Sequence, residues 1–272
     1  MPIIIDGVEQ AADPKGLFES LNDIATILGT VATTFWPFLE AVGTQIVSYH
    51  QKDHDLTPQD ELAKVALEQE FAPHKMPGGT FSYYFDAAGN QHLRSLDHAD
   101  FDFGNGTADN TFAVGAWILP LDITTVILIS KYDAVGTARQ WLWSLDGSSK
   151  LSLELFDESA SPDAFEIGAG DTAVTTNIWT FVCTVYDGED ETPKVLHYLN
   201  GAVDGAGATT ETGTYVAMEA LAPDLIVGAS GATTAPVNEF NGRIALPFVC
   251  GKQLTAAEVG DLYQIGRPLI GV

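Results

Sequence analysis

The stretch Phe-Ala-Val-Gly-Ala-Trp at residues 112–117 opens the part of the chain that decides the fold. It is the first of several short apolar or alternating runs separated by Gly, Asn and Asp turns. The others are Ile-Leu-Ile-Ser-Lys (127–131), Ile-Trp-Thr-Phe-Val-Cys-Thr-Val-Tyr-Asp-Gly (178–188), Leu-His-Tyr-Leu-Asn-Gly (196–201), Leu-Ile-Val-Gly (225–228) and Phe-Asn-Gly-Arg-Ile (240–244). Many short strands at this spacing indicate an all-β, antiparallel sandwich.

Two turns within this region have hairpin chemistry. Residues 141–145 alternate between apolar and polar, Asp146-Gly147 follows, and residues 151–156 alternate back. Asn200-Gly201 is a second turn of the type that requires φ > 0. Pro247 lies inside the last apolar run and lacks a backbone N–H, so it restricts that strand to a sheet edge or a bulge.

The order of these runs resembles the laminin-G-like jelly roll of the concanavalin A-like lectin/glucanase superfamily, over about residues 81–267. The most similar features are Tyr198 before the Asn-Gly turn, the closing segment that starts at Phe240, and a short terminal helix. In that helix Thr255 and Glu258 form a capping box. The resemblance implies a jelly-roll sandwich, but this fold hosts lectins, glycosidases, adhesion modules and virion parts.

Residues 1–79 differ from the rest and are expected to be a helical anchor with a linker, ahead of a sandwich at 80–272. Asp13-Pro14 is a helix start signal, and apolar residues then recur at steps of 4 and 3, the heptad pattern. The heptad residues are Leu17, Leu21, Ile24, Leu28, Val31, Phe35, Phe38 and Val42. Thr57 and Pro58 predict a second helix that runs to about Glu70.

Three interpretations of the heptad residues compete. They could mediate homo-oligomerisation or docking onto a partner protein, which is the interpretation we favour. They could pack against the chain's own sandwich or its second helix. They could also belong to a membrane span, but Pro37 and Glu40 interrupt the uncharged run, and a span needs about 20 apolar residues. We therefore expect no membrane span.

The charge of the chain excludes some partners. The 272 residues carry a net charge of −25, and no basic cluster occurs, so nucleic acid and anionic membranes are not expected partners. Such a surface favours cations, a basic protein or high salt. Cys183 and Cys250 lie in apolar strand-like runs and are expected to be buried free thiols, although a disulfide stays open.

Catalysis is not expected. Glycosidases with this sandwich resemble one another in a Glu-x-Asp-x-x-Glu strand, which places two carboxylates on one face. The nearest candidate here is Glu154-Leu-Phe-Asp157-Glu158, in which Glu154 and Asp157 point to opposite faces of a strand. The sequence therefore predicts a protein that is not an enzyme.

Three aspartates could bind calcium. Asp97, Asp100 and Asp102 supply hard oxygen ligands, and some laminin-G-like relatives bind calcium at a sandwich rim. The alternative is a solvated acidic loop, because calcium needs more oxygens than this run provides. His98 is expected to be a surface residue rather than a ligand.

A glycan site could form around two tryptophans. Trp141 and Trp143 share one strand face and could stack on a sugar, with Tyr132 and Arg139 nearby. The alternative is that the pair fills the core of the sandwich.

Together these features favour a non-catalytic structural or attachment protein of a large assembly, most plausibly a bacteriophage virion. It would be a capsid decoration, head-fibre or tail-associated protein that contacts itself and a capsid or tail protein, and displays a lectin-like sandwich toward a cell-surface glycan. The N-terminal residues 1–6 lack the basic and apolar segments of a secretory signal, which favours assembly in the host cytoplasm and a place on the virion surface. A carbohydrate-binding or adhesion module is the alternative, and a glycoside hydrolase the second alternative.

Overall fold

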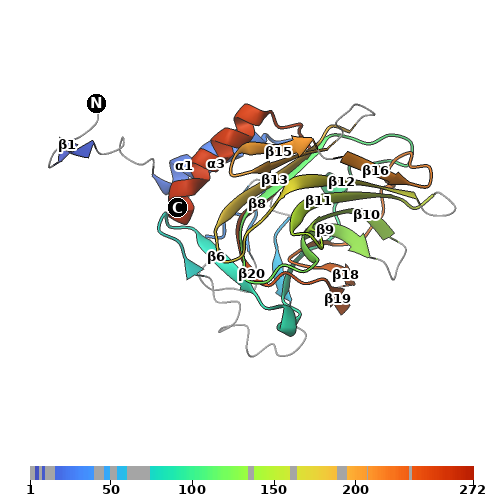
Figure 1. The fold of residues 1–272 in the computed structure, drawn as a ribbon, viewed down its shortest axis with the longest axis horizontal. Helices are drawn as coiled ribbons and strands as arrows, with labels where there is room; N and C mark the ends of the chain where they lie inside the picture. Colours follow the sequence, from blue (N-terminus) through green and yellow to red (C-terminus); the bar gives the residue numbers. More distant parts are fainter. Residues whose placement is uncertain are drawn as a thin grey trace.

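The computed structural model describes residues 4–5, 8–9, 16–39, 46–49, 54–59, 74–133, 138–159, 164–188, 195–206, 208–232 and 235–272. Over these residues the chain is mainly β, and two large antiparallel sheets lie face to face (Figure 1). The predicted all-β antiparallel sandwich is confirmed.

The first sheet has the strand order β16-β12-β11-β10-β9-β17-β7-β4. Its strands are β4 (Thr57–Gln59), β7 (His92–Ser95), β9 (Val126–Asp133), β10 (Ala138–Leu145), β11 (Lys150–Asp157), β12 (Ala164–Ala173), β16 (Ala208–Thr212) and β17 (Leu225–Val227). The β10–β11 hairpin closes where Leu145 pairs with Leu151. A carboxylate oxygen of Asp146 accepts from the backbone N–H groups of Ser148 at 2.7 Å and Lys150 at 2.9 Å. The predicted hairpin is confirmed.

The second sheet has the order β15-β14-β13-β8-β20-β6-β5, with β3 also paired to β20. Its strands are β3 (Thr34–Phe35), β5 (His74–Lys75), β6 (Phe81–Phe85), β8 (Phe112–Pro120), β13 (Thr180–Tyr186), β14 (Val195–Leu199), β15 (Ala202–Ala206) and β20 (Gly242–Cys250). Asn200 and Gly201 join β14 to β15 with φ of 51° and 79°, as the turn signal predicted. The β8–β20 register shifts between Ala245 and Phe248, so Pro247 lies in a bulge, which confirms one of its two predicted settings.

Smaller elements complete the described chain. Two short hairpins are formed by β1 (Ile4–Ile5) with β2 (Val8–Glu9) and by β18 (Ser230–Ala232) with β19 (Ala235–Val237). Two 3-10 turns, η1 (Ala87–Gly89) and η2 (Ala99–Phe101), flank β7. The second of these turns carries candidate site residues.

The main core fills the space between the two sheets. Trp141 and Trp143 enter it from the first sheet, and Phe112, Val114 and Ile244 enter it from the second. Aromatic rings pack closely there; the rings of Phe103 and Phe112 are stacked with centroids 4.3 Å apart. Burying these side chains is the main term that stabilises the sandwich.

The outer face of the second sheet is covered by two helices, α1 (Leu17–Leu28) and α3 (Ala256–Ile270) (Figure 1). The predicted capping box begins α3: the Thr255 hydroxyl accepts from the Glu258 N–H at 3.3 Å, and the Glu258 carboxylate accepts from the Thr255 N–H at 2.9 Å. Among the described residues no helix is long and apolar enough to cross a membrane.

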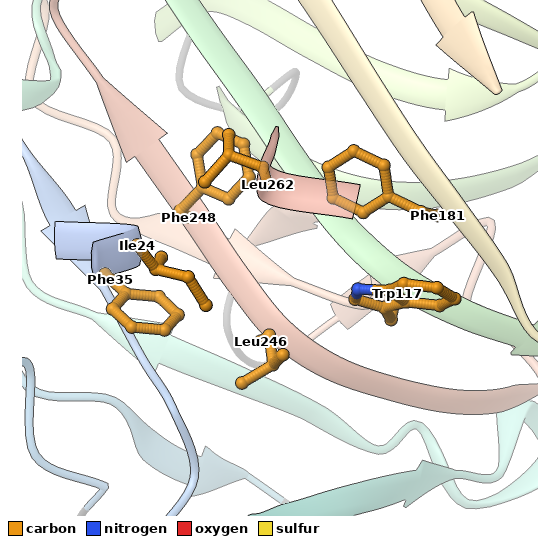
Figure 2. A pocket seen from close by; sticks show the side chains of 7 residues that line it. All are labelled: Ile24, Phe35, Trp117, Phe181, Leu246, Phe248 and Leu262. Atoms are coloured by element: carbon orange, nitrogen blue, oxygen red, sulfur yellow. The ribbon is translucent and has the colours of Figure 1, made fainter. Parts of the chain in front are cut away.

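The interface between these helices and the sheet is tightly packed. A void of about 10 Å³ remains there. Figure 2 shows the side chains that line it, which are Ile24, Phe35, Trp117, Phe181, Leu246, Phe248 and Leu262. A void of this size holds at most one water, and its lining is apolar, so it is a packing gap rather than a ligand site.

The heptad prediction is corrected by the structure. The helix ends at Leu28, where Gly29 adopts φ of 80° and Ala32 follows with φ of 44°. Beyond it, Val31 is exposed and Phe35 lies in β3, paired with Phe248 of β20. A strand-paired residue cannot continue a helical stripe, so the predicted helical run of heptad residues stops at Leu28. Val42 itself, like Asp13 and Pro14, lies outside the described residues.

The inward heptad residues pack on the chain's own sandwich. Leu21, Ile24 and Leu28 are buried against the outer face of the second sheet, and Leu17 and Phe38 also contact apolar neighbours of the fold. This confirms self-packing, the second of the three interpretations, for the described residues. Oligomerisation through the heptad residues stays a prediction, although Leu21, Ile24 and Leu28 already pack against the chain's own sheet.

The second N-terminal helix is also corrected at its start. Thr57–Gln59 is the edge strand β4, which pairs with β7, because Leu93 and its neighbours offer an open sheet edge. The rest of the predicted helix, to Glu70, lies outside the described residues. Since β3, β4 and β5 pair with strands of the sandwich and α1 packs on its second sheet, these described parts of residues 1–79 are built into the sandwich, whereas β1 and β2 form a separate two-stranded sheet.

Candidate functional site

The predicted tryptophan platform is not on the surface. Trp141 and Trp143 point into the core from β10 and are both 0% exposed. The Trp141 indole N–H donates to the carbonyl of Phe101 at 3.2 Å, and that of Trp143 donates to the Thr184 hydroxyl at 2.7 Å. A sugar needs an open ring face, so the assignment of these two residues to a glycan site is wrong, and the alternative core role is confirmed.

Trp143 belongs to a buried hydrogen-bond chain that fixes the proton positions along it. Since the Thr184 hydroxyl accepts from Trp143, its own proton is directed to His197 Nδ1 at 2.8 Å. His197 Nε2 then donates to the carbonyl of Gly168 at 3.0 Å. Burial lowers the pKa of His197 from 6.5 to about 4, so the imidazole is neutral, as this chain requires.

The other two predicted glycan residues face outward from the first sheet. Tyr132 pairs with Arg139 across β9 and β10. The Arg139 guanidinium binds the Glu158 carboxylate through two nitrogens, with the Nη2–Oε2 distance at 3.0 Å, and lies 5.5 Å from the centre of the Phe156 ring. The Tyr132 ring contacts the same phenylalanine at 5.2 Å. Tyr132, Arg139, Phe156 and Glu158 therefore contact one another in a packed cluster on the surface of the first sheet.

Two of the three predicted calcium ligands bind a lysine of the chain itself. Lys131 is fully buried, and its ammonium contacts the carboxylates of Asp97 and Asp102, the latter at 3.1 Å. The carbonyls of Leu221 and Pro223 each accept from it at 3.2 Å. A buried charge needs such partners, and the carboxylates of Asp97 and Asp102 are engaged by this ammonium.

The third aspartate faces a different way. A carboxylate oxygen of Asp100 lies 3.5 Å from Nε2 of His54 and 3.6 Å from Nδ1 of His98. Asp97 and Asp102 face Lys131 whereas Asp100 faces two histidines, so the three aspartates do not form one set of calcium ligands. His98, expected to be a surface residue, is 38% exposed, but its ring belongs to this histidine cluster.

The carboxylates considered for catalysis have other roles. Asp157 is buried and accepts from the N–H groups of Ser159 and Val216, both at 3.0 Å. Glu158 binds Arg139, and Glu154 lies on β11 with a pKa raised by burial. A retaining glycosidase needs two available carboxylates about 5–5.5 Å apart across a substrate cleft.

A surface hollow of about 390 Å³ lies where the β12–β13 connection meets the β14–β15 hairpin. Its polar lining comes from threonines, Asn200 and Asp204, and its apolar lining includes Ile178 and Val203. The full lining is Thr172, Ala173, Val174, Thr175, Ile178, Thr180, Leu199, Asn200, Ala202, Val203 and Asp204. Pockets for small ligands begin at about 300 Å³ and combine apolar walls with a few fixed polar groups, which this hollow does.

Two of its polar groups are held in place by the backbone. The Asn200 side-chain oxygen accepts from the N–H of Phe181 at 3.0 Å, which fixes the orientation of its planar amide. Asp204 is buried and accepts from the N–H of Thr172 at 3.3 Å. The hollow therefore presents fixed acceptors beside apolar side chains.

Sequence reasoning missed Lys131, His54 and the hollow. Lys131, which follows the apolar run 126–129 and Ser130, was a usable signal, because it predicts a charge that must find a buried partner. His54 is far in sequence from His98 and Asp100, and no spacing rule connects them. The hollow depends on two loops whose positions only the assembled sheets fix.

Comparisons with known proteins agree with the architecture. The sequence pattern of the concanavalin A-like lectin/glucanases superfamily, in its Laminin_G_3 form, matches residues 88–260, so the chain belongs to this superfamily. No curated protein matches the chain.

Among solved structures, domain 4 of AbnA, a GH43 extracellular arabinanase from Geobacillus stearothermophilus solved with arabinotriose, matches with a TM-score of 0.56 and 17% identity. That match covers 85% of this chain and 97% of the domain. The binding domain of Paraclostridial Mosquitocidal Protein 1 matches with a TM-score of 0.59 and 11% identity, over 87% of this chain and 52% of that one.

A structure of botulinum neurotoxin type C, a toxin whose cell entry depends on interaction with two ganglioside molecules, also matches. Its TM-score is 0.56 and its identity 10%, over 89% of this chain and 52% of the other. The chain thus spans about half the length of these toxin domains. At such identities the likeness shows a shared fold.

Proposed function

We propose that this member of the concanavalin A-like superfamily is a non-catalytic glycan-binding module that attaches a larger assembly to a surface. The hollow between the β12–β13 connection and the β14–β15 hairpin carries the proposal, because it is the described surface site with ligand-sized volume and fixed polar groups. Similar domains were solved with arabinotriose or depend on gangliosides, which supports a saccharide as the ligand.

The lining of the hollow fits a sugar ring. Sugars present hydroxyl groups along their edges and C–H groups on their faces. Thr172, Asn200 and Asp204 offer donors and acceptors to the hydroxyls, and Ile178 and Val203 offer apolar contact to a face. The hollow has no aromatic residue in its lining, so we expect weak binding at each site, which repetition in an assembly would strengthen through multivalency.

The non-catalytic part of the proposal is supported by the carboxylates. Asp157 and Glu158 are engaged with backbone N–H groups and with Arg139, so protonation of a glycosidic oxygen would first have to break these contacts. We expect no release of reducing sugar from β-glucans or galactans. Turnover that disappears in Glu154→Gln or Glu158→Gln would contradict this.

The assembly is proposed to be a bacteriophage virion, with the chain as a homo-oligomeric capsid decoration, head-fibre or tail-associated protein on its surface. Phe18 in the first turn of α1 and Val31, three residues after the end of this helix, are 67% and 70% exposed, and we propose them as apolar contacts to a capsid or tail protein. The mass of the full chain by light scattering, alone and in the particle that contains it, tests this part: a monomer that appears in no particle would refute it.

Glycan binding is tested with the full chain on an array of plant, bacterial and sialylated saccharides. Val203→Arg places a long charged side chain in the hollow, and we expect it to abolish binding. Val237→Arg is the matched control, since both valines are about half exposed (52% and 48%) and Val237 lies on β19, outside the hollow. Equal binding by the two variants, or no saccharide bound by the unmodified chain, would contradict the proposal.

A further inference from the structure

Two histidines and an aspartate from separate parts of the chain meet in one cluster. His54 precedes β4, whereas His98 and Asp100 flank the start of η2. One donor atom of each residue lies within 4.8 Å of those of the other two. We propose that this cluster binds a divalent transition metal of the zinc class, a site that goes beyond the glycan-binding function.

The spacing of the donor atoms fits such an ion. Zinc binds histidine nitrogen and carboxylate oxygen at about 2.0–2.2 Å, so neighbouring ligands of a tetrahedral ion lie roughly 3.4 Å apart. Here Nε2 of His54 and Nδ1 of His98 lie 3.5 Å and 3.6 Å from the same Asp100 oxygen. Small shifts of the partly exposed His98 ring would bring all three donors to bonding distance.

His54 is held in place as a metal ligand should be. Its Nδ1 is hydrogen-bonded to the buried Thr34 hydroxyl of β3, its carbonyl accepts from the Trp36 indole N–H at 2.7 Å, and its ring packs on Phe101 at 4.7 Å. When Nδ1–H donates to Thr34, Nε2 presents its lone pair toward Asp100. Such a contact on the far nitrogen fixes the tautomer and orientation of metal-binding histidines.

The other two ligands make the site accessible. His98 and Asp100 are 38% and 30% exposed, so an ion can arrive from solvent, and a water can complete its coordination. In the structure His98 Nδ1 accepts from the N–H of Asp100 at 3.1 Å, which caps η2. Metal binding at Nδ1 replaces this single hydrogen bond.

The donor set selects the class of ion. Two imidazole nitrogens and one carboxylate suit zinc, cobalt, nickel or copper, whereas calcium takes 6–8 oxygens and magnesium keeps several waters. Through Thr34 and η2 the ion would tie β3, the segment before β4 and the turn after β7 together. We therefore expect it to stabilise the fold.

Calorimetric titration of the metal-free, untagged full chain with Zn²⁺ tests the proposal, alongside melting temperatures with Zn²⁺, Mg²⁺ or Ca²⁺. We expect one zinc per chain and a rise in melting temperature with Zn²⁺ that the other two ions do not reproduce. His98→Ala and Asp100→Asn should each weaken zinc binding on the order of 100-fold or more, since each removes a direct ligand, and changes to outer contacts alone cost about 10–100-fold.

Asp122→Asn removes an exposed carboxylate outside the cluster and should bind zinc as the unmodified chain does. Visible absorption of Co²⁺ in place of zinc should be lost in the two ligand variants, provided that their metal-free melting temperatures stay close to that of the unmodified chain. If a ligand variant unfolds, the unmodified chain is treated with diethyl pyrocarbonate instead. We expect bound zinc to protect its histidines from modification. Zinc binding unchanged by His98→Ala and Asp100→Asn, several equivalent zinc sites, or no protection would overturn the proposal.

Discussion

Two glycines of α3 provide a sharp test of how this helix is packed. A Cβ added at Gly266 would lie 2.3 Å from Nε1 of Trp117 and 3.1 Å from its Cε2. The Trp117 ring cannot retreat, because it is buried and lies against Phe181 and Tyr263 at 5.6 Å each. In Gly266→Ala the helix must therefore move off the sheet.

The magnitude follows from two opposing terms. Overpacking a core contact costs about 1–3 kcal/mol, and the contact at Gly266 is short enough to favour the upper half of that range. Alanine regains about 0.8–1 kcal/mol of helix propensity over glycine, so the net loss in Gly266→Ala is roughly 1–2 kcal/mol. Gly260 is the matched control in the same helix: its added Cβ would meet only the carbonyl of Gly201 at 3.8 Å, an ordinary contact.

Gly260→Ala should therefore be stabilised by roughly 0.5–1 kcal/mol through propensity alone. The two variants are compared by urea unfolding and by melting temperature. At about 2–4 °C per kcal/mol for a domain of this size, their melting temperatures should differ by roughly 3–12 °C. Shifts of the same sign and size in both variants would refute the packing argument.

Three further predictions concern buried polar groups. Lys131→Met leaves the carboxylates around it without their cation and should cost about 3 kcal/mol of unfolding free energy. This is the low end for a broken buried ion pair, because Asp97 is still 35% exposed and can rehydrate. Urea unfolding midpoints measure this loss, and an unchanged midpoint would show that the ion pair does not stabilise the fold. The folded pKa of His197, about 4, lies below its ordinary 6.5, so the unfolded chain binds the proton first as pH falls. Stability should then drop by about 3 kcal/mol between roughly pH 6.5 and 4, and His197→Gln should flatten that slope; an identical slope in the variant would exclude His197 as its source. Burial raises the pKa of the Cys183 thiol and raises that of Cys250 to about 12. A thiol reagent at pH 8 should therefore label neither cysteine in the folded chain and both cysteines after unfolding. Rapid labelling of the native protein would contradict the burial of these thiols.

The sequence alone determined the features that depend on a few neighbouring residues. The turns at Asp146-Gly147 and Asn200-Gly201 and the capping box at Thr255 each follow from backbone preferences that act locally. Pro247 limited its strand to a sheet edge or a bulge, and the β8–β20 register decided for the bulge. The order of the apolar runs was enough for the sandwich and its family. Both cysteines are free and buried, as their apolar surroundings indicated.

Only the tertiary structure decided which face of each helix or strand packs in the core and which neighbouring element it contacts. The heptad spacing runs through two kinds of element: α1 buries apolar residues on the outer face of the second sheet, whereas β3 is a strand of that sheet and pairs with β20. Residues 1–79 were expected to form an anchor ahead of the sandwich, but α1, β3, β4 and β5 pack on its sheets or pair with their strands. Alternation shows that Trp141 and Trp143 share a face, but not that this face is the core.

The same limit applies to the sites. Asp97, Asp100 and Asp102 are neighbours in sequence, yet a lysine on β9 binds two of them and a histidine beside β4 faces the third. A period of two or of three and a half specifies which residues point together. Such a period does not specify which distant strands pair, and only that pairing brings Lys131 and His54 to these carboxylates. The reason is that two charged side chains interact when they lie a few ångströms apart in space, whatever their separation along the chain.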